Sequence, residues 1–298
     1  MTETTAPGDA SLAVSPGISR SQSFIQIFFG RKIAVFGAVV ILVMIVVAIF
    51  APLIAPYDPY QQNLREALQQ PSRDHLLGTD PFGRDTLSRI IYGTRPSLAV
   101  GLVSVGIGAL LGMSIGLLGG YFGGIVDTLT MRAIDALMFI PPLMLALAIG
   151  AALGGGLGNV MISLGIALTP TYARLMRCEV LTVKQAEYVT AGRAIGCRDI
   201  RIMLVHVLPN TLPPLIVLIT LNLGTAILTE AALSFLGLGI APPGAAWGAM
   251  VNDGYRYLLS NPILSFAPGL CIMLVVLAFN LAGDGVRDAL DPRLRGVI

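Results

Sequence analysis

The chain has 298 residues, of which 55% are hydrophobic and 12% are charged, and its mean hydropathy is +0.79. A soluble domain carries about twice that fraction of charged residues, so a water-soluble globule is excluded, and the excess of apolar residues excludes a disordered chain. The net charge of +2 is too small for a nucleic-acid-binding domain. A chain of this kind is best divided into membrane spans, each of which needs roughly 20 apolar residues.

Long stretches without Asp, Glu, Lys or Arg mark the expected spans. Their apolar runs are continuous, which is typical of helices rather than of transmembrane strands with alternating apolar residues. With the ends adjusted for Gly and Pro, the sequence predicts an all-α integral membrane protein. Its six transmembrane helices are expected at 33–55, 97–119, 129–152, 158–177, 209–236 and 262–283.

The distribution of Lys and Arg predicts the orientation of these helices. With a cytoplasmic N-terminus, thirteen of the nineteen basic residues fall on the cytoplasmic side, which is the side that basic residues favour. Five of the other six lie in a segment, 56–96, that also carries five acidic residues. Both termini are therefore predicted to be cytoplasmic.

These expectations divide the chain into four parts. Residues 1–23 are polar and are predicted to form a disordered cytoplasmic tail. Residues 24–56 hold the first transmembrane helix and its flank, and residues 57–96 form an extracytoplasmic segment. Residues 97–298 form a five-helix transmembrane core with a cytoplasmic loop at 178–208.

The chain lacks the motifs of several enzyme classes. It has no Gly-Lys pair for a phosphate-binding P-loop, and its two histidines, His75 and His206, form no HExxH zinc motif. Its three cysteines form no CxxC pair. We therefore expect no catalytic residue, no metal site and no cofactor, and any ATP hydrolysis would need a separate subunit.

Two acidic residues, Asp135 and Glu230, lie near the ends of predicted transmembrane helices. An ionisable group in a span can line a substrate or ion pathway, but it can also cap a helix at the membrane surface or pair with an Arg. Both interpretations stay open. Asn222, in the same predicted helix as Glu230, is a third candidate for a pathway-lining residue.

Four glycines recur at steps of four in the second predicted helix, at Gly108, Gly112, Gly116 and Gly120. They share one face and would let another helix approach closely. That neighbour could belong to this chain or to a partner subunit.

The loop at 178–208 is the largest predicted cytoplasmic feature. Residues 180–195 have helical composition, Gly196 ends this helix, and Asp199 begins a second one, whose N-terminal dipole an acidic residue complements. The result is a helix–Gly–helix hairpin. It could be an amphipathic surface element, or a projection that docks on a soluble partner supplying energy.

This loop resembles the EAA loop of bacterial ABC-importer permeases. Ala191-Gly192, Gly196 and Leu208-Pro209 keep its spacing, although Thr190 stands in place of the motif's acid. Other stretches resemble the C-type permeases of the dipeptide, oligopeptide and nickel branch of binding-protein-dependent importers. They are 55–59 (APYDP), 75–85 (HLLGTDPFGRD), 206–210 (HVLPN), 230–239 (EAALSFLGLG), 280–285 (NLAGDG) and 287–292 (RDALDP).

The resemblance implies the ABC importer type I permease fold in the bacterial cytoplasmic membrane. It implies a heterodimer with a second homologous permease, two cytoplasmic ATP-binding subunits and an extracytoplasmic solute-binding protein. The chain would then move di- or oligopeptides, or a related solute such as glutathione or nickel, by alternating access. The loop that couples it to an ATPase would include Glu187, Ala191, Gly192, Gly196 and Asp199.

A stand-alone ion-coupled secondary transporter is the alternative function. It would need a buried ionisable relay, for which Asp135 and Glu230 are the available groups. A structural membrane protein, in contrast, would need neither a relay nor a coupling loop.

Overall fold

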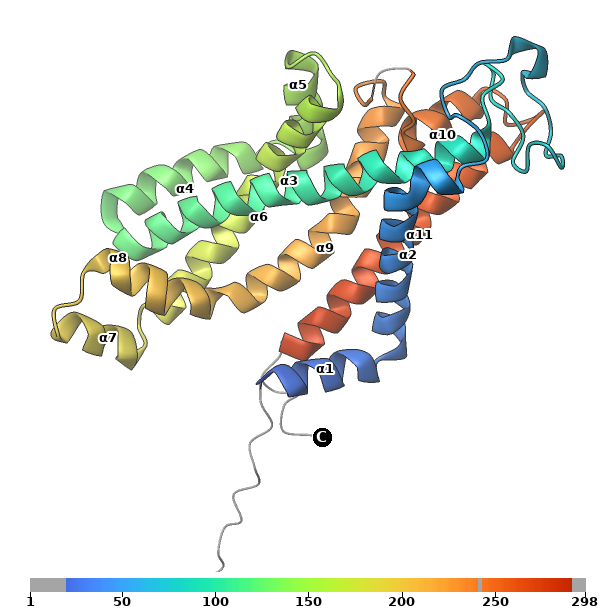
Figure 1. Ribbon diagram of the computed structural model, residues 1–298. Coiled ribbons are helices and arrows are strands. Elements are labelled where there is room, and N and C mark those ends of the chain that lie inside the picture. Colours follow the sequence, from blue (N-terminus) through green and yellow to red (C-terminus); the bar gives the residue numbers. More distant parts are fainter. Residues whose placement is uncertain (1–19, 241–242, 291–298) are drawn as a thin grey trace, which may run out of the picture.

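A computed structural model describes residues 20–240 and 243–290, most of which are helical (Figure 1). The helices are α1 (Arg20–Gly30), α2 (Lys32–Ile54), α3 (Thr86–Phe122), α4 (Gly124–Met138), α5 (Pro142–Ala152), α6 (Leu157–Val183), α7 (Glu187–Ala194), α8 (Asp199–Arg201), α9 (Leu208–Phe235), α10 (Trp247–Tyr255) and α11 (Ile263–Leu290). A 3₁₀ turn lies at Leu64–Glu66 and a π-helical stretch at Ile202–Val207. Within the two described ranges there is no β-strand, so the predicted all-α class is confirmed.

The predicted tail, 1–23, lies mostly outside the described residues. Its last part differs from the expectation, because residues 20–23 form the first turn of α1. α1 lies across the end of α11 and meets α2 at a sharp corner (Figure 1). At this corner Arg31 forms a 2.5 Å ion pair with Asp288 of α11.

Four helical segments of the described chain are long and apolar enough to cross a membrane. They are α2, α3, the continuous helix Asp199–Phe235, and α11. α4 and α5 together have the composition of a fifth, with a bend of 90° between them. α6 is 27 residues long, but polar and basic residues such as Asn159 and Arg174 lower its apolar content. The count of six spans therefore stays a prediction.

The helix predicted over 129–152 is broken, so the expectation of one continuous helix there was wrong. α4 ends at Met138 and α5 begins at Pro142, directly after Pro141. Proline has no N–H to continue a helix, and it disfavours the helical conformation of the residue before it. Two consecutive prolines therefore stop the first helix and turn the chain.

α3 is 37 residues long and begins at Thr86, well before the predicted start at 97. The Asp85 carboxylate caps it by accepting a 2.8 Å hydrogen bond from the Ser88 N–H. Arg89, in the first turn, is 3% exposed. Its guanidinium donates to three loop carbonyls, those of Pro59, Pro243 and Gly244. Charged residues can extend this helix because the loops fold over them.

The loop between α9 and α11, predicted without a helix, contains α10. Its Trp247 side chain is 1% exposed, and Nε1 donates a 2.9 Å hydrogen bond to the Ile90 carbonyl of α3. Gly93 leaves room for this ring, since a Cβ there would lie 2.8 Å from the indole. The α9–α11 loop is thereby held on the first turns of α3.

α3 runs through the middle of the molecule, with α6 along it, while α2 packs against α11 (Figure 1). α2 buries only Ala34, Gly37 and Ala51. The rest of its surface is largely apolar and exposed, as expected of a helix that contacts lipid. The buried apolar clusters lie around α3 and α9, where α5, α6, α10 and α11 pack against them.

Pro52 interrupts the hydrogen bonding of α2. It has no N–H to offer the carbonyl of Ala48, one turn earlier. Arg95 of α3 supplies the missing donor: its Nε lies 2.6 Å from the Ala48 oxygen, and its Nη2 also lies 3.1 Å from the Ile49 oxygen. The carbonyl that the proline leaves free thus becomes a polar contact between α2 and α3.

Candidate functional site

The loop at 178–208 forms one separate short helix, α7, which a tight turn joins to α8, the first turn of the continuous helix Asp199–Phe235. α6 continues to Val183, so the predicted 180–195 helix is divided, and α7 is the separate helix Glu187–Ala194. Gly196 has a φ of +81°. Its N–H and that of Cys197 donate to the carbonyls of Arg193 and Gly192, which closes the end of α7. A left-handed residue is required at this turn, and glycine adopts that conformation without strain.

The space around Gly196 is open, since a Cβ there would meet nothing within 4 Å. Its constraint is therefore the backbone conformation and not a close approach. Gly192, in contrast, is buried and its Cβ position lies 3.9 Å from Ile202.

We use the term hairpin for α7, the Gly196 turn and α8. One side of the hairpin is buried, because Val189 and Ile202, which directly follows α8, are both 0% exposed within one apolar cluster. The hairpin also carries large exposed apolar side chains: Tyr188 near the start of α7 (46%), Ile195 in the turn (81%) and Ile200 in α8 (64%). Among the residues expected to couple to an ATPase, Glu187, Ala191, Gly196 and Asp199 are exposed. A firmly seated element that presents apolar side chains can dock on a partner.

Asp199 makes a contact that the sequence did not indicate. Its Oδ1 accepts a 2.7 Å hydrogen bond from the Oη of Tyr121, near the end of α3. It also lies in the first turn of the short α8, as expected. The carboxylate thus joins the hairpin to a helix 78 positions earlier in the chain.

The four glycines of α3 face α6 of the same chain. A Cβ on Gly108 would lie 2.8 Å from Leu168, and one on Gly112 would lie 2.6 Å from Tyr172. The next two glycines face Met176 and Val180 in turn. Each successive glycine of α3 therefore meets the next turn of α6, and the backbones of the two helices approach each other closely.

The candidate pathway residues lie apart from one another. Asp135 pairs with Arg174 of α6 at 2.6 Å, with both side chains substantially exposed. Glu230 is 2% exposed, and its Oε1 accepts a 2.6 Å hydrogen bond from Ser234, while its Oε2 has no partner among residues 20–240 and 243–290. Asn222 donates a 3.0 Å hydrogen bond to the Tyr172 hydroxyl. Asp135 therefore matches the ion-pair interpretation, whereas Glu230 is neither paired with an Arg nor at the surface.

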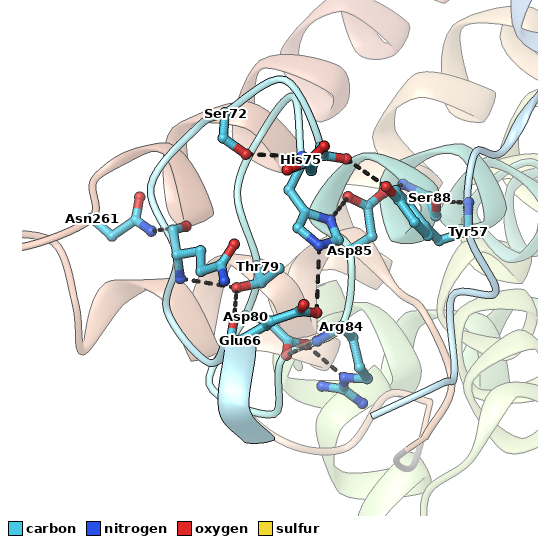
Figure 2. A network of polar contacts seen from close by, with 12 residues as sticks. Tyr57, Glu66, Ser72, His75, Thr79, Asp80, Arg84, Asp85, Ser88 and Asn261 are labelled. Carbon is cyan, nitrogen blue, oxygen red and sulfur yellow. Dashed lines mark hydrogen bonds and ion pairs between the residues drawn. The ribbon is translucent and has the colours of Figure 1, made fainter. Parts of the chain in front are cut away.

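A buried polar network holds the α2–α3 loop, residues 55–85, against the first turn of α3 (Figure 2). His75 Nδ1 lies 2.9 Å from Asp85 Oδ1. Asp80 Oδ2 lies 2.6 Å from Arg84 Nε, and both side chains are nearly buried. These residues belong to the 75–85 motif, and the motif therefore serves to fold this loop.

Asp253 of α10 lies beside the same network. Although Asp253 is partly exposed, desolvation by the surrounding protein raises the pKa of its carboxyl above the ordinary value, against the opposing effect of the Arg84 and Arg89 guanidinium groups. Asp253 also lines a small cavity with Asp80, Arg89 and Met250. The two loops at this end of the molecule therefore share one set of charged groups.

Comparison with known proteins identifies the family. Residues 108–296 match the model of the binding-protein-dependent transport system inner membrane component, and residues 19–71 match the N-terminal TM domain of oligopeptide transport permease C. Among solved structures, the inward-facing MetNI methionine ABC transporter aligns with a TM-score of 0.55 at 21% identity, covering 68% of this chain and 96% of that chain. At this identity the likeness concerns the fold alone.

Several curated relatives match nearly the whole chain. A dipeptide transport system permease protein of Alkalihalophilus pseudofirmus is 43% identical over 289 residues, which cover 97% of this chain and 94% of that protein. A di/tripeptide transport system permease protein of Pseudomonas aeruginosa is 45% identical, with 97% of both chains covered. A glutathione transport system permease protein of Escherichia coli O1:K1 is 44% identical, covering 90% of this chain and 89% of that one.

These matches favour a permease subunit over a stand-alone ion-coupled carrier. They also agree with the motifs at 75–85 and 230–239, which resemble the same branch. The chain therefore belongs to the family of binding-protein-dependent transport system inner membrane components, as a multi-pass ABC-transporter permease subunit of the dipeptide/oligopeptide type.

Proposed function

We propose that the chain is one of two homologous permease subunits of an ATP-driven importer for di- or oligopeptides or a related solute. The relatives named for dipeptides, di/tripeptides and glutathione support this solute class. The inclusion of nickel as a related solute is supported only by the resemblance of the sequence motifs. Two ATP-binding subunits supply the energy, an extracytoplasmic binding protein delivers the solute, and this chain hydrolyses no ATP.

The proposed topology has six spans with both termini in the cytoplasm. α2, α3, the bent pair α4–α5, α6, the Asp199–Phe235 helix and α11 would cross in turn. In Figure 1, α1, α7 and α8 lie toward one end of the molecule, and α5, α10 and the α2–α3 loop lie toward the other. Alternation of six spans would put exactly those groups on opposite sides, which supports the count.

The hairpin is our candidate for the element that couples the spans to an ATPase. The single observation that carries this role is the combination of a buried side, with Val189 and Ile202, and exposed apolar side chains at Tyr188, Ile195 and Ile200. Apolar side chains on an otherwise charged cytoplasmic loop favour burial against a protein surface. Glu187, Ala191, Gly192, Gly196 and Asp199 would shape and position this contact.

Transport would proceed by alternating access. When ATP closes the ATPase pair, the hairpins of the two permeases move together, and the spans repack from an inward-open to an outward-open arrangement. Hydrolysis reverses the change. The chain contributes two packings of similar stability, and the nucleotide state selects between them.

Asp135, Glu230 and Asn222 remain our candidates for groups that line the pathway. Glu230 is the strongest of them, because a buried carboxylate oxygen without a partner is costly and could be satisfied in a second arrangement of the helices. Asp135 is the weakest, since Arg174 already pairs with it.

The coupling role is tested at Gly196 in the complete complex. Gly196→Trp forces a side chain into a left-handed turn and projects an indole from the docking surface, while the membrane spans are untouched. We expect normal membrane insertion and assembly with the second permease, but loss of ATP-driven uptake and weaker retention of the ATPases. Gly196→Asn is the matched control, because Asn tolerates this conformation better than other residues with a side chain. Normal uptake by a stably inserted Gly196→Trp complex would reject the coupling role.

A further inference from the structure

Tyr121 lies at the end of α3, where three parts of the cytoplasmic loop converge. The side chain is 3% exposed. It belongs to the same apolar cluster as Val180 of α6, Val189 of α7 and Ile202 of the π-helical stretch. The ring is thus packed among the elements that enter, form and leave the hairpin.

The polar contacts of Tyr121 reach the same three parts. Its Oη donates to Asp199 Oδ1 of α8 at 2.7 Å, and its carbonyl oxygen accepts a hydrogen bond from Lys184 Nζ in the turn before α7. The Arg193 guanidinium of α7 lies over the aromatic ring, 5.7 Å from its centroid. A single residue of α3 therefore contacts the start, the middle and the end of the loop.

These contacts matter because the hairpin is connected to only some of the spans by the chain itself. It continues from α6 and leads into the Asp199–Phe235 helix, so those helices move with it directly. α3 has no such connection. Gly116 and Gly120 seat α3 on α6, and the Tyr121 hydroxyl adds a directed hydrogen bond between α3 and α8 itself.

α3 is also the helix that reaches the opposite end of the molecule. It is 37 residues long, or about 55 Å at 1.5 Å per residue. Its N-cap Asp85 and its first-turn residue Arg89 hold the α2–α3 and α9–α11 loops. A displacement of α3 at Tyr121 would therefore also move the α2–α3 and α9–α11 loops at the far end of this helix.

We propose that Tyr121 is a positioning residue for transport: its hydroxyl bond to Asp199 makes α3 follow the hairpin. Without that bond, the ATPases still bind and hydrolyse ATP, but the movement of the hairpin in each ATPase cycle is transmitted only partly to α3. The proposal rests on the coupling role of the hairpin proposed above.

The test uses the complete complex in proteoliposomes, with both permeases, two ATPases and the binding protein. The probe is a mixture of radiolabelled dialanine and glutathione, and the readout is uptake per ATP hydrolysed. Tyr121→Phe removes one hydroxyl and keeps the ring in its cluster. We expect at least a fivefold fall in uptake per ATP, the lower end of ordinary coupling between sites, with ATPase retention and thermal unfolding close to wild type.

Variants of the acceptor separate positioning from packing. Asp199→Asn keeps an oxygen that can accept from the Tyr121 hydroxyl, so it should retain more of the uptake per ATP than Asp199→Ala, which should fall at least as far as Tyr121→Phe because it also removes the acid from the first turn of α8. The double variant Tyr121→Phe/Asp199→Ala should be no worse than Asp199→Ala alone, because both changes remove the same bond. Tyr255→Phe, at an exposed tyrosine of α10, is the matched control for a tyrosine hydroxyl.

The outcomes distinguish this inference from the function on which it rests. If Gly196→Trp abolishes uptake while Tyr121→Phe keeps the wild-type uptake per ATP hydrolysed, the hairpin couples the ATPases to transport but the role proposed for Tyr121 is overturned. Equal losses for Asp199→Asn and Asp199→Ala would also overturn it, because the hydrogen bond would then not be the cause. If both Gly196→Trp and Tyr121→Phe transport normally, the coupling role fails and the inference fails with it.

Discussion

Asp85 Oδ1 lies 2.9 Å from His75 Nδ1, while Oδ2 of the same carboxylate accepts hydrogen bonds from the Ser88 N–H and Oγ–H at 2.8 and 2.7 Å. One buried carboxylate therefore caps α3 and fixes the loop that precedes it (Figure 2). The loop and the helix should consequently lose order together.

We expect Asp85→Ala to destabilise this end of the molecule by about 1–3 kcal/mol, because Ser88 and His75 both lose a buried partner. Protease sensitivity of the α2–α3 loop in membranes should rise. Asp85→Asn keeps an oxygen that can accept from the Ser88 N–H, so its protease sensitivity should lie between that of the wild type and that of Asp85→Ala. Wild-type resistance of Asp85→Ala would show that the network does not hold the loop.

The glycine face of α3 gives a second prediction. Gly112→Leu places a side chain where even a Cβ lies 2.6 Å from Tyr172, so α3 and α6 must separate. We expect poor accumulation and early thermal unfolding of the solubilised protein. Gly106→Leu is the control, because Gly106 lies on the same helix and its Cβ position meets nothing within 4 Å. Equal behaviour of the two variants would contradict the α3–α6 contact.

Asp253 predicts a dependence of stability on pH. Desolvation by the surrounding protein raises the pKa of this carboxyl in the folded protein above its unfolded value, so the folded state binds the proton more tightly. Its contribution to stability is present at low pH and is lost as the pH rises through the raised pKa. Asp253→Asn should therefore melt slightly above the wild type at neutral pH, with a small difference because solvent screens this partly exposed residue, and the difference should close as the pH falls toward the ordinary pKa of Asp. Thermal unfolding across that pH range measures it, and a gap that widens on acidification would refute it.

Single cysteines test the six-span topology in a chain freed of Cys178, Cys197 and Cys271. Gln62→Cys and Leu259→Cys, both at exposed positions, should react with an impermeant thiol reagent added to cells with a permeable outer layer and an intact cytoplasmic membrane. Gln185→Cys, just before α7, should react only after lysis. The reverse pattern would invert the orientation, and labelling of all three from outside would change the number of spans.

The candidate site was predictable in outline because its signals are local. The Gly196 turn and the acid at Asp199 could be recognised from neighbouring residues, and the glycine face could be recognised from its four-residue spacing. Tyr121 and Lys184 gave no comparable signal. Their role depends on where α3 ends relative to a loop some 60 to 80 positions later, a relationship that no local pattern contains.

The sequence by itself determined the class of protein and the helices whose surroundings are uniform. α2 and α11 begin within a residue of the predicted starts, because an unbroken apolar run needs only lipid to be stable as a helix. Tertiary structure alone decided the early start of α3, the presence of α10 and the packing of α6, rather than another helix, against the glycine face. Each depends on contacts such as that of Trp247 with Ile90, 157 positions apart, which let polar or short segments become helical by burying them. Composition predicts which segments are stable as helices in lipid. The residues that satisfy the buried polar groups of the other segments are decided only when segments distant in the sequence come together.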